Sequence, residues 1–166
     1  MVGVKSTDSD PRASRALHAL AAIGDRGLSI GVNDAHHVPA PGRTDPGLTN
    51  AQIGAIHEFG LGNNPERSFL RAWLDDESNW MPELERRIGA AVDAAESGLN
   101  TDKWLEDFAA FCVKSIQDRM RAGIAPPILA STLNRKQGGD APLIDTEQLL
   151  NAIEAHVGLS ASGGAA

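Results

Sequence analysis

Three histidines and a glutamate are the residues of this chain whose types suggest metal chemistry. His36 and His37 are adjacent, and His57 is followed directly by Glu58. Imidazole nitrogens and a carboxylate are ordinary zinc ligands, and a bound zinc ion could activate water for hydrolysis. The zinc-protease motif needs a second histidine four residues after the first, but position 61 is Leu61. A small metal-dependent hydrolase that uses the His36, His37 and His57 region is therefore only the alternative function. For the main interpretation we expect no metal and no cofactor.

The candidate nucleophiles lack the groups that would activate them. Cys112 is the single cysteine, and it falls at helical spacing from Phe108, which predicts a small buried hydrophobe with no reason to be a thiolate. Ser131 and Thr132 lack the glycine-flanked turn that exposes a nucleophilic hydroxyl. The sequence therefore predicts a protein that is not an enzyme.

The charge distribution argues against a basic nucleic-acid groove. The net charge is -7, and residues 51–100 hold 4 Lys and Arg against 9 Asp and Glu. A nucleic-acid site needs clustered basic side chains to neutralise phosphates. An acidic stretch that faced a channel would instead repel DNA, so we expect DNA to pass nearby without specific binding. The residues of this candidate lumen face are Asp75, Asp76, Glu77, Glu83 and Glu85.

Helical patterns dominate the elements that must position these groups. Thr49 with Gln52 fits a reciprocal cap at the start of a short helix, which Gly60 would end. Asp145 with Gln148 fits the same pattern near the C-terminus. Other helices are predicted to begin at Asp10-Pro11 and at Asn64-Pro65. Pro82 would break or kink the second of these, or start a new helix that runs to about residue 97. The strongest apolar stripe spans residues 102–121.

Two segments, residues 28–33 and 153–159, have the pattern of half-buried strands. Two strands alone are marginal, so the sheet would gain a strand from a loop or from a neighbouring subunit. Residues 33–48 hold three prolines and two glycines and predict a long loop, an assembly arm or an active-site lid. We predict one α+β domain over residues 10–159, with a small antiparallel or mixed sheet packed against several helices. Residues 1–9 and 160–166 would be flexible ends.

Four segments, in order, resemble phage virion-morphogenesis and tail-completion (neck) proteins. They are residues 55–60 (AIHEFG), 65–71 (PERSFLR), 126–136 (PPILASTLNRK) and 142–150 (PLIDTEQLL). The family patterns they match are IHEFG with IPxRxFLR, and PPLxxxTxxRK with KPLIDTGxL. The resemblance covers roughly residues 49–155. Two positions depart from it: Glu147 stands where a glycine is usual, and Ile128 stands after the double proline where the pattern has leucine.

The resemblance implies a structural virion protein of the neck or upper tail, assembled in the host bacterial cytoplasm. Such proteins form rings that complete the tail or join it to the head. The expected partners are further copies of the chain, in a hexameric ring with a dodecamer as the alternative, and other neck, connector and tail-tube proteins. No segment approaches the roughly 18 apolar residues of a membrane span, so no membrane partner is expected.

The interface candidates come from the matching segments and are Glu58, Arg67, Arg71, Arg135 and Lys136. Arg67 and Arg71 lie four residues apart, which would place them on one helix face. There they would bind carboxylates across a subunit boundary or simply face solvent. A regulatory binding protein encoded by a prophage is the third interpretation that the sequence leaves open.

Overall fold

The computed structural model describes residues 10–24, 26–39, 44–99, 103–127 and 147–159. The helices are α1 (Pro11–Gly24), α2 (Asn50–Phe59), α3 (Arg71–Leu74), the short 3-10 helix η1 (Glu77–Asn79), α4 (Met81–Glu96), α5 (Trp104–Ala122) and α7 (Gln148–Asn151). The strands are β1 (Arg26–Val32) and β2 (Ile153–Leu159). This arrangement confirms the predicted α+β class. Arg135, Lys136 and Asp145 lie outside the described residues.

The sheet joins the two predicted strands in one antiparallel pair. The register runs from Arg26 opposite Leu159 to Val32 opposite Ile153. A further bond, from the Asn33 N–H to the carbonyl oxygen of Ala152 at 2.9 Å, continues the pairing beyond β1. The described part of the chain adds no third strand to this sheet.

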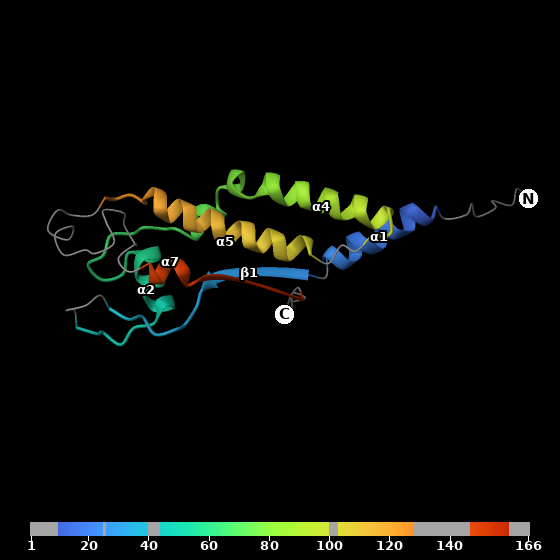
Figure 1. The fold of residues 1–166 in the computed structure, drawn as a ribbon. Coiled ribbons are helices and arrows are strands. Elements are labelled where there is room, and N and C mark those ends of the chain that lie inside the picture. The colour runs from blue at the N-terminus through green and yellow to red at the C-terminus, as the bar shows by residue number, and fades with distance from the viewer. Residues whose placement is uncertain (1–9, 25, 40–43, 100–102, 128–146, 160–166) are drawn as a thin grey trace, which may run out of the picture.

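The molecule is layered, with α4, α5 and the sheet stacked in that order (Figure 1). α1 lies at one end of these layers, and α2 and α7 lie at the other. The apolar stripe of α5 forms the centre of the core, since Phe108, Cys112, Ile116 and Met120 are all buried. Phe69 and Trp73 pack against this stripe, and burial of each large side chain contributes about 1.5–3 kcal/mol.

The caps of α2 are the ones that its sequence predicts. Thr49 Oγ1 accepts from the Gln52 N–H at 3.2 Å, and Gln52 Oε1 accepts from the Thr49 N–H at 3.0 Å. Gly60 ends the helix at φ 63°, a left-handed conformation that favours glycine. A Cβ at this position would also lie 2.8 Å from the backbone nitrogen of Glu66, so the chain can turn back here only with a glycine.

The helix predicted from Asn64-Pro65 is wrong over most of its length. α3 begins only at Arg71, and the residues before it form turns, bends and irregular backbone. Leu74, the last residue of α3, is 57% exposed. The next helix, α4, begins at Met81, and Pro82 occupies its first turn. The physical reason for the late start of α3 is a side chain of α2, described below.

The capping pair predicted at Asp145 and Gln148 is also not what begins α7. Its N-cap is Glu147, which has φ 59° and makes no side-chain capping bond. The Gln148 side chain instead binds Val38 in both directions: the Val38 N–H donates to Oε1 at 2.9 Å, and Nε2 donates to the Val38 carbonyl. This contact ties the first part of the predicted 33–48 loop to α7.

Candidate assembly site

Glu58, in the last turn of α2, is a buried carboxylate bound to the backbone of the segment that follows. Its Oε1 accepts from Ser68 Oγ at 2.5 Å and from the Arg71 N–H at 3.0 Å. Its Oε2 accepts from the N–H groups of Phe69 at 2.9 Å and Leu70 at 3.0 Å. Burial alone would raise the pKa of Glu58, but these hydrogen bonds outweigh it and the pKa lies below its ordinary value. The anion consumes the free N–H groups at the start of α3, which explains why the helix begins so late.

Arg67 is buried as well and binds inside its own chain. Only 8% of the residue is exposed. Its Nε donates to the carbonyl oxygen of Pro126 at 2.9 Å, and its Nη2 donates to that of Pro127 at 3.3 Å. The backbone N–H of Arg67 also donates to the carbonyl of His57 at 2.8 Å. Arg67 therefore does not share an exposed helix face with Arg71, contrary to the spacing-based expectation.

Together, Glu58 and Arg67 connect three of the four segments that carry the family resemblance. Glu58 joins residues 55–60 to residues 65–71, and Arg67 joins residues 65–71 to the double proline at 126–127. Each bond is charge-assisted and mostly removed from water, which makes it stronger than an ordinary hydrogen bond. In this structure the polar residues of the motifs act as internal fastenings.

Arg71 is the motif arginine that reaches the surface. It forms an ion pair with Glu66, with side-chain exposures of 47% and 57%. Its guanidinium carbon lies 5.4 Å from the centre of the Phe59 ring, a cation–π geometry. Phe59 itself is 56% exposed. Both residues stand at the rim of an apolar groove.

This groove, here called the β1 groove, has a volume of about 490 Å³ and runs between β1 and the helices α2 and α3. One wall is the face of β1 that carries alternate apolar side chains, and the floor includes Ile116 of α5. Its lining residues are Leu28, Ile30, Val32, Ala51, Gly54, Ala55, Glu58, Phe59, Leu70, Arg71, Trp73, Leu74 and Ile116. Because Glu58 already binds four donors, an occupant of the groove would meet mainly apolar surface.

The three histidines of the hydrolase hypothesis do not share a site, since His36 and His37 bind different side chains. His36 Nε2 lies 3.0 Å from Asp45 Oδ2, and His37 Nδ1 lies 2.9 Å from Asn50 Oδ1. The buried Nδ1 of His57 has no hydrogen-bond partner among the residues that the structure describes. Burial, with the charges of Arg67 and His37, lowers the pKa of His57 to about 4. Within the described residues, no three His, Cys, Asp or Glu side chains are placed to hold one metal ion.

Cys112 lies on the buried face of α5, as its spacing predicted, and is 1% exposed. Burial raises the pKa of its thiol to about 11. A thiol with such a pKa stays protonated at neutral pH, so it is a poor nucleophile.

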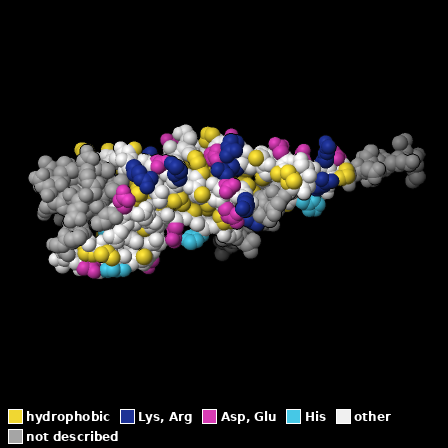
Figure 2. Space-filling model, in the orientation of Figure 1, with side chains coloured by type: hydrophobic (Ala, Val, Ile, Leu, Met, Phe, Trp, Pro, Cys, Tyr) yellow, Lys and Arg dark blue, Asp and Glu magenta, His cyan; other side chains and the backbone are white. Residues whose placement is uncertain are grey.

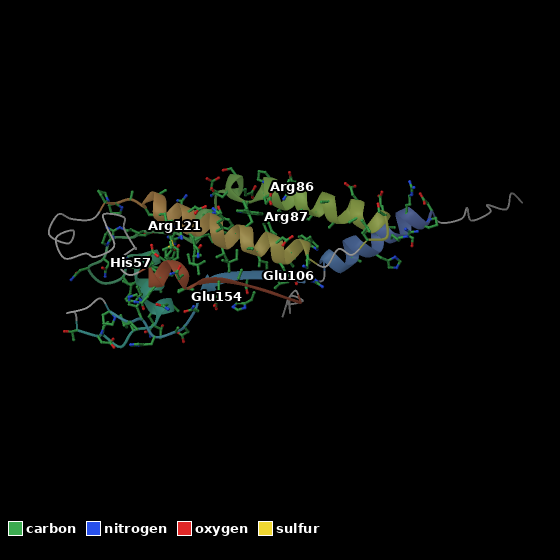
Figure 3. The ribbon with its side chains drawn as sticks, viewed as in Figure 1. His57, Arg86, Arg87, Glu106, Arg121 and Glu154 are labelled. Carbon is green, nitrogen blue, oxygen red and sulfur yellow. The ribbon has the colours of Figure 1, made fainter. Side chains whose placement is uncertain are left out.

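The acidic stretch is not one continuous negative surface. Glu83 forms ion pairs with both Arg86 and Arg87, at 2.7 Å to each. The hydrogen bond from Arg86, and to a lesser extent the one from Arg87, lowers the pKa of Glu83 to about 2. Figure 3 places Arg86 and Arg87 on α4, and Figure 2 shows acidic and basic side chains interspersed over this part of the molecule. Asp76 caps η1 by accepting from the Ser78 N–H at 3.2 Å.

Sequence reasoning missed the β1 groove, because its walls come from segments that are distant in sequence. The one local signal for this surface was the presence of two large apolar residues, Phe59 and Leu61, on either side of the glycine that ends α2. In the structure Phe59 and Leu61 are 56% and 49% exposed.

Comparison of the chain with protein-family models, curated proteins and solved structures found no match. None of the helices among the described residues has the length and apolar content that a membrane crossing requires.

Proposed function

We propose that this chain is a structural subunit of the neck or upper tail of a tailed phage, and that it forms a ring which completes the tail or joins it to the head. Its work is association with other copies and with neck, connector and tail-tube proteins. DNA passes through the ring without specific binding.

The observation that carries this proposal is the convergence of the motif segments. Four sequence patterns suggested the family, and three of them meet through the buried side chains of Glu58 and Arg67. A subunit that works by assembly needs a rigid scaffold of this kind, whereas a hydrolase would need convergent polar groups that remain free to react. The donors around Glu58 are consumed in holding the backbone.

The fourth segment supports the resemblance at the position where its sequence differs from the family pattern. Glu147 occupies the position where the family usually has glycine, and its backbone has φ 59°. Glycine is the residue that adopts this conformation without strain. The family pattern and the geometry of this chain therefore agree on what the position requires.

The histidine-based hydrolase has no specific observation in its favour. His36, His37 and His57 bind different partners or none, as described above. The exposed apolar rim at Phe59 and Leu74 favours a protein–protein surface instead.

The test is the solution mass of the purified chain, measured by light scattering across a range of concentration and salt, alone and with virion partner proteins. A ring, seen also by negative-stain electron microscopy, supports the proposal and gives its stoichiometry. A monomer that ignores those partners and carries metal by elemental analysis would overturn it.

A further inference from the structure

The two strands of the sheet each turn one edge outward. In an antiparallel pair, residues that exchange hydrogen bonds alternate with residues whose N–H and C=O groups point away from the partner strand. The bond from Asn33 to Ala152 marks one hydrogen-bonded position of the ladder. Counting back along the register, Ser29 opposite His156 is hydrogen-bonded too, and Ile30 opposite Ala155 is not.

The outward groups therefore belong to residues 28, 30 and 32 of β1 and to residues 153, 155 and 157 of β2. No backbone hydrogen bond from elsewhere in the described chain reaches them. Open edges of this kind are normally protected by proline, by lysine or by a covering segment. Neither strand contains proline or lysine.

The open edge of β1 lies directly beside the β1 groove, because Leu28, Ile30 and Val32 line the groove and also carry the outward backbone groups. A strand added to this edge would place every second side chain over the groove. Such an addition supplies main-chain bonds from the edge and apolar contact from the groove, which is a general mode of strand recognition.

We propose that the occupant is a second copy of this chain, with the edge of its β2 paired to the edge of β1. This inference rests on the proposed function as a self-assembling subunit. β1 and β2 are both seven residues long, run in opposite directions and carry outward groups at alternate positions. The order β2–β1–β2–β1 across copies is antiparallel throughout, so the ladder of one subunit continues into the next.

Pairing of β1 with β2 is head-to-tail, which determines the kind of assembly. A head-to-tail contact forms a ring when its rotation closes. Pairing of β1 with β1 would form a two-fold dimer and leave both β2 edges open. Only the closed ring consumes every edge, which removes the hazard that open edges present.

Ring closure also decides which surface lines the channel. α5 packs on one face of the sheet, and Ser29, Glu154 and His156 alternate onto the other face. Because α5 and α4 both lie on one side of the sheet, we place the helices outside the ring and the opposite sheet face inside. A Cβ added at Gly31 or Gly158 would meet no other atom within 4 Å, which indicates how open this face is. Figure 3 places Glu154 on β2, with α5 between it and the arginines of α4.

The test uses proline to remove one outward N–H from each edge of the full-length chain. Ala155→Pro changes the β2 edge with little change in side-chain size, and Ala155→Ser is its control because it keeps the N–H. Ile30→Pro changes the β1 edge, with Ile30→Ala as the control for lost packing. Neither N–H belongs to the internal ladder, so both proline variants should fold, which circular dichroism checks.

We expect each proline variant to weaken self-association by about tenfold to a hundredfold relative to its control, because a buried carbonyl loses its donor. An equimolar mixture of the two variants retains one intact β1 edge and one intact β2 edge. It should therefore form a dimer and stop there, as native mass spectrometry would record. In the wild-type ring the amide protons of Ile30 and Ala155 should exchange slowly, whereas in the monomer only those of Ser29 and His156 should.

Several outcomes would overturn the edge pairing. If both proline variants still form the rings that the wild type forms, the edge pairing is overturned and the proposed function stands. A dimer formed by Ala155→Pro alone would also overturn it, because it would indicate β1–β1 contact. A wild-type chain that stays monomeric by itself also overturns the inference, and the mass in the presence of virion partners then decides the proposed function separately.

Discussion

Replacement of Glu58 by glutamine should destabilise the protein far more than the same replacement of a glutamate at the surface. Glutamine keeps the shape but turns one oxygen into an NH2 group facing two N–H or O–H donors. Two of the four bonds are then lost, and a hydrogen bond to a charged group contributes about 1.5–3 kcal/mol. Allowing for local relaxation, we expect Glu58→Gln to lower the free energy of unfolding by about 3 kcal/mol.

The assay is urea unfolding followed by tryptophan fluorescence, with Glu66→Gln as the matched control. Glu66 also pairs with a cation of the same segment, Arg71, but at the surface, where such pairs contribute about 0–1 kcal/mol. For a slope of about 1.5–2 kcal/mol/M, the Glu58→Gln midpoint should fall by roughly 1.5–2 M. The control should move by less than about 0.5 M on the same slope.

The effect of Glu58→Gln should also depend on pH in a defined direction. The folded pKa of Glu58 lies below its unfolded value of about 4.3. Its stabilisation is therefore fully present above the unfolded value and is lost as the pH falls through the folded value. The gap between wild type and variant should narrow below about pH 4. A loss equal to that of Glu66→Gln, or a gap that does not change with pH, would refute the assignment of Glu58 as a buried anionic fastening.

Three other substitutions test separate features. Arg67→Lys should lower the unfolding free energy by about 1–3 kcal/mol, because one ammonium cannot replace the fork that binds two carbonyls; a change within error by urea titration would contradict this. Glu147→Gly should raise the thermal stability by about 1 kcal/mol by relieving φ 59°, whereas Glu147→Ala should not, and equal melting temperatures would argue against strain there. His57 has a folded pKa of about 4, below the unfolded value of about 6.5, so wild type should lose about 1–2 kcal/mol between pH 7 and pH 5. His57→Leu should remove that loss, and an unchanged pH profile of stability in the variant would rule out His57 as its source.

Elements whose signals are local were predictable from the sequence. The capping box of Thr49 and Gln52 and the left-handed Gly60 define α2 at both ends, and both are found. The apolar stripe of α5 was predicted over residues 102–121 and is found at Trp104–Ala122. Both strands were predicted as well, because alternation is a property of neighbouring residues.

The failures all involve contacts between distant residues. The segment before α3 has the composition of a helix, but Glu58 binds the N–H groups of Phe69, Leu70 and Arg71 and holds that backbone outside the helix. Gln148 has the type of a capping residue, but its amide pairs with Val38, 110 residues away. Local propensity predicts that such side chains bond to residues close by in sequence, and a tertiary contact overrides that preference.

The site was less predictable than the fold for the same reason. Arg67 and Arg71 look equivalent in the sequence, yet one is buried against two proline carbonyls and the other is half exposed over Phe59. No local rule separates them, because the distinction depends on where residues 126–127 run. The groove likewise exists only once β1, α2 and α3 are assembled.

The buried bonds of Glu58 and Arg67 help to shape the groove that lies beside the open edge of β1. Glu58 and Arg67 fix the segment that leads into α3, and α3 supplies the wall of the groove opposite β1. A wall held by charged bonds can keep an apolar groove open in an unassembled subunit, where it would otherwise collapse onto the sheet. If the edges pair as proposed, the acidic run at residues 75–77 follows α3 on the helical side and lies away from the channel. Glu154 then becomes the carboxylate that DNA meets, so electrostatic repulsion from the channel wall would come from a residue of β2 and not from the acid-rich stretch that composition alone singles out.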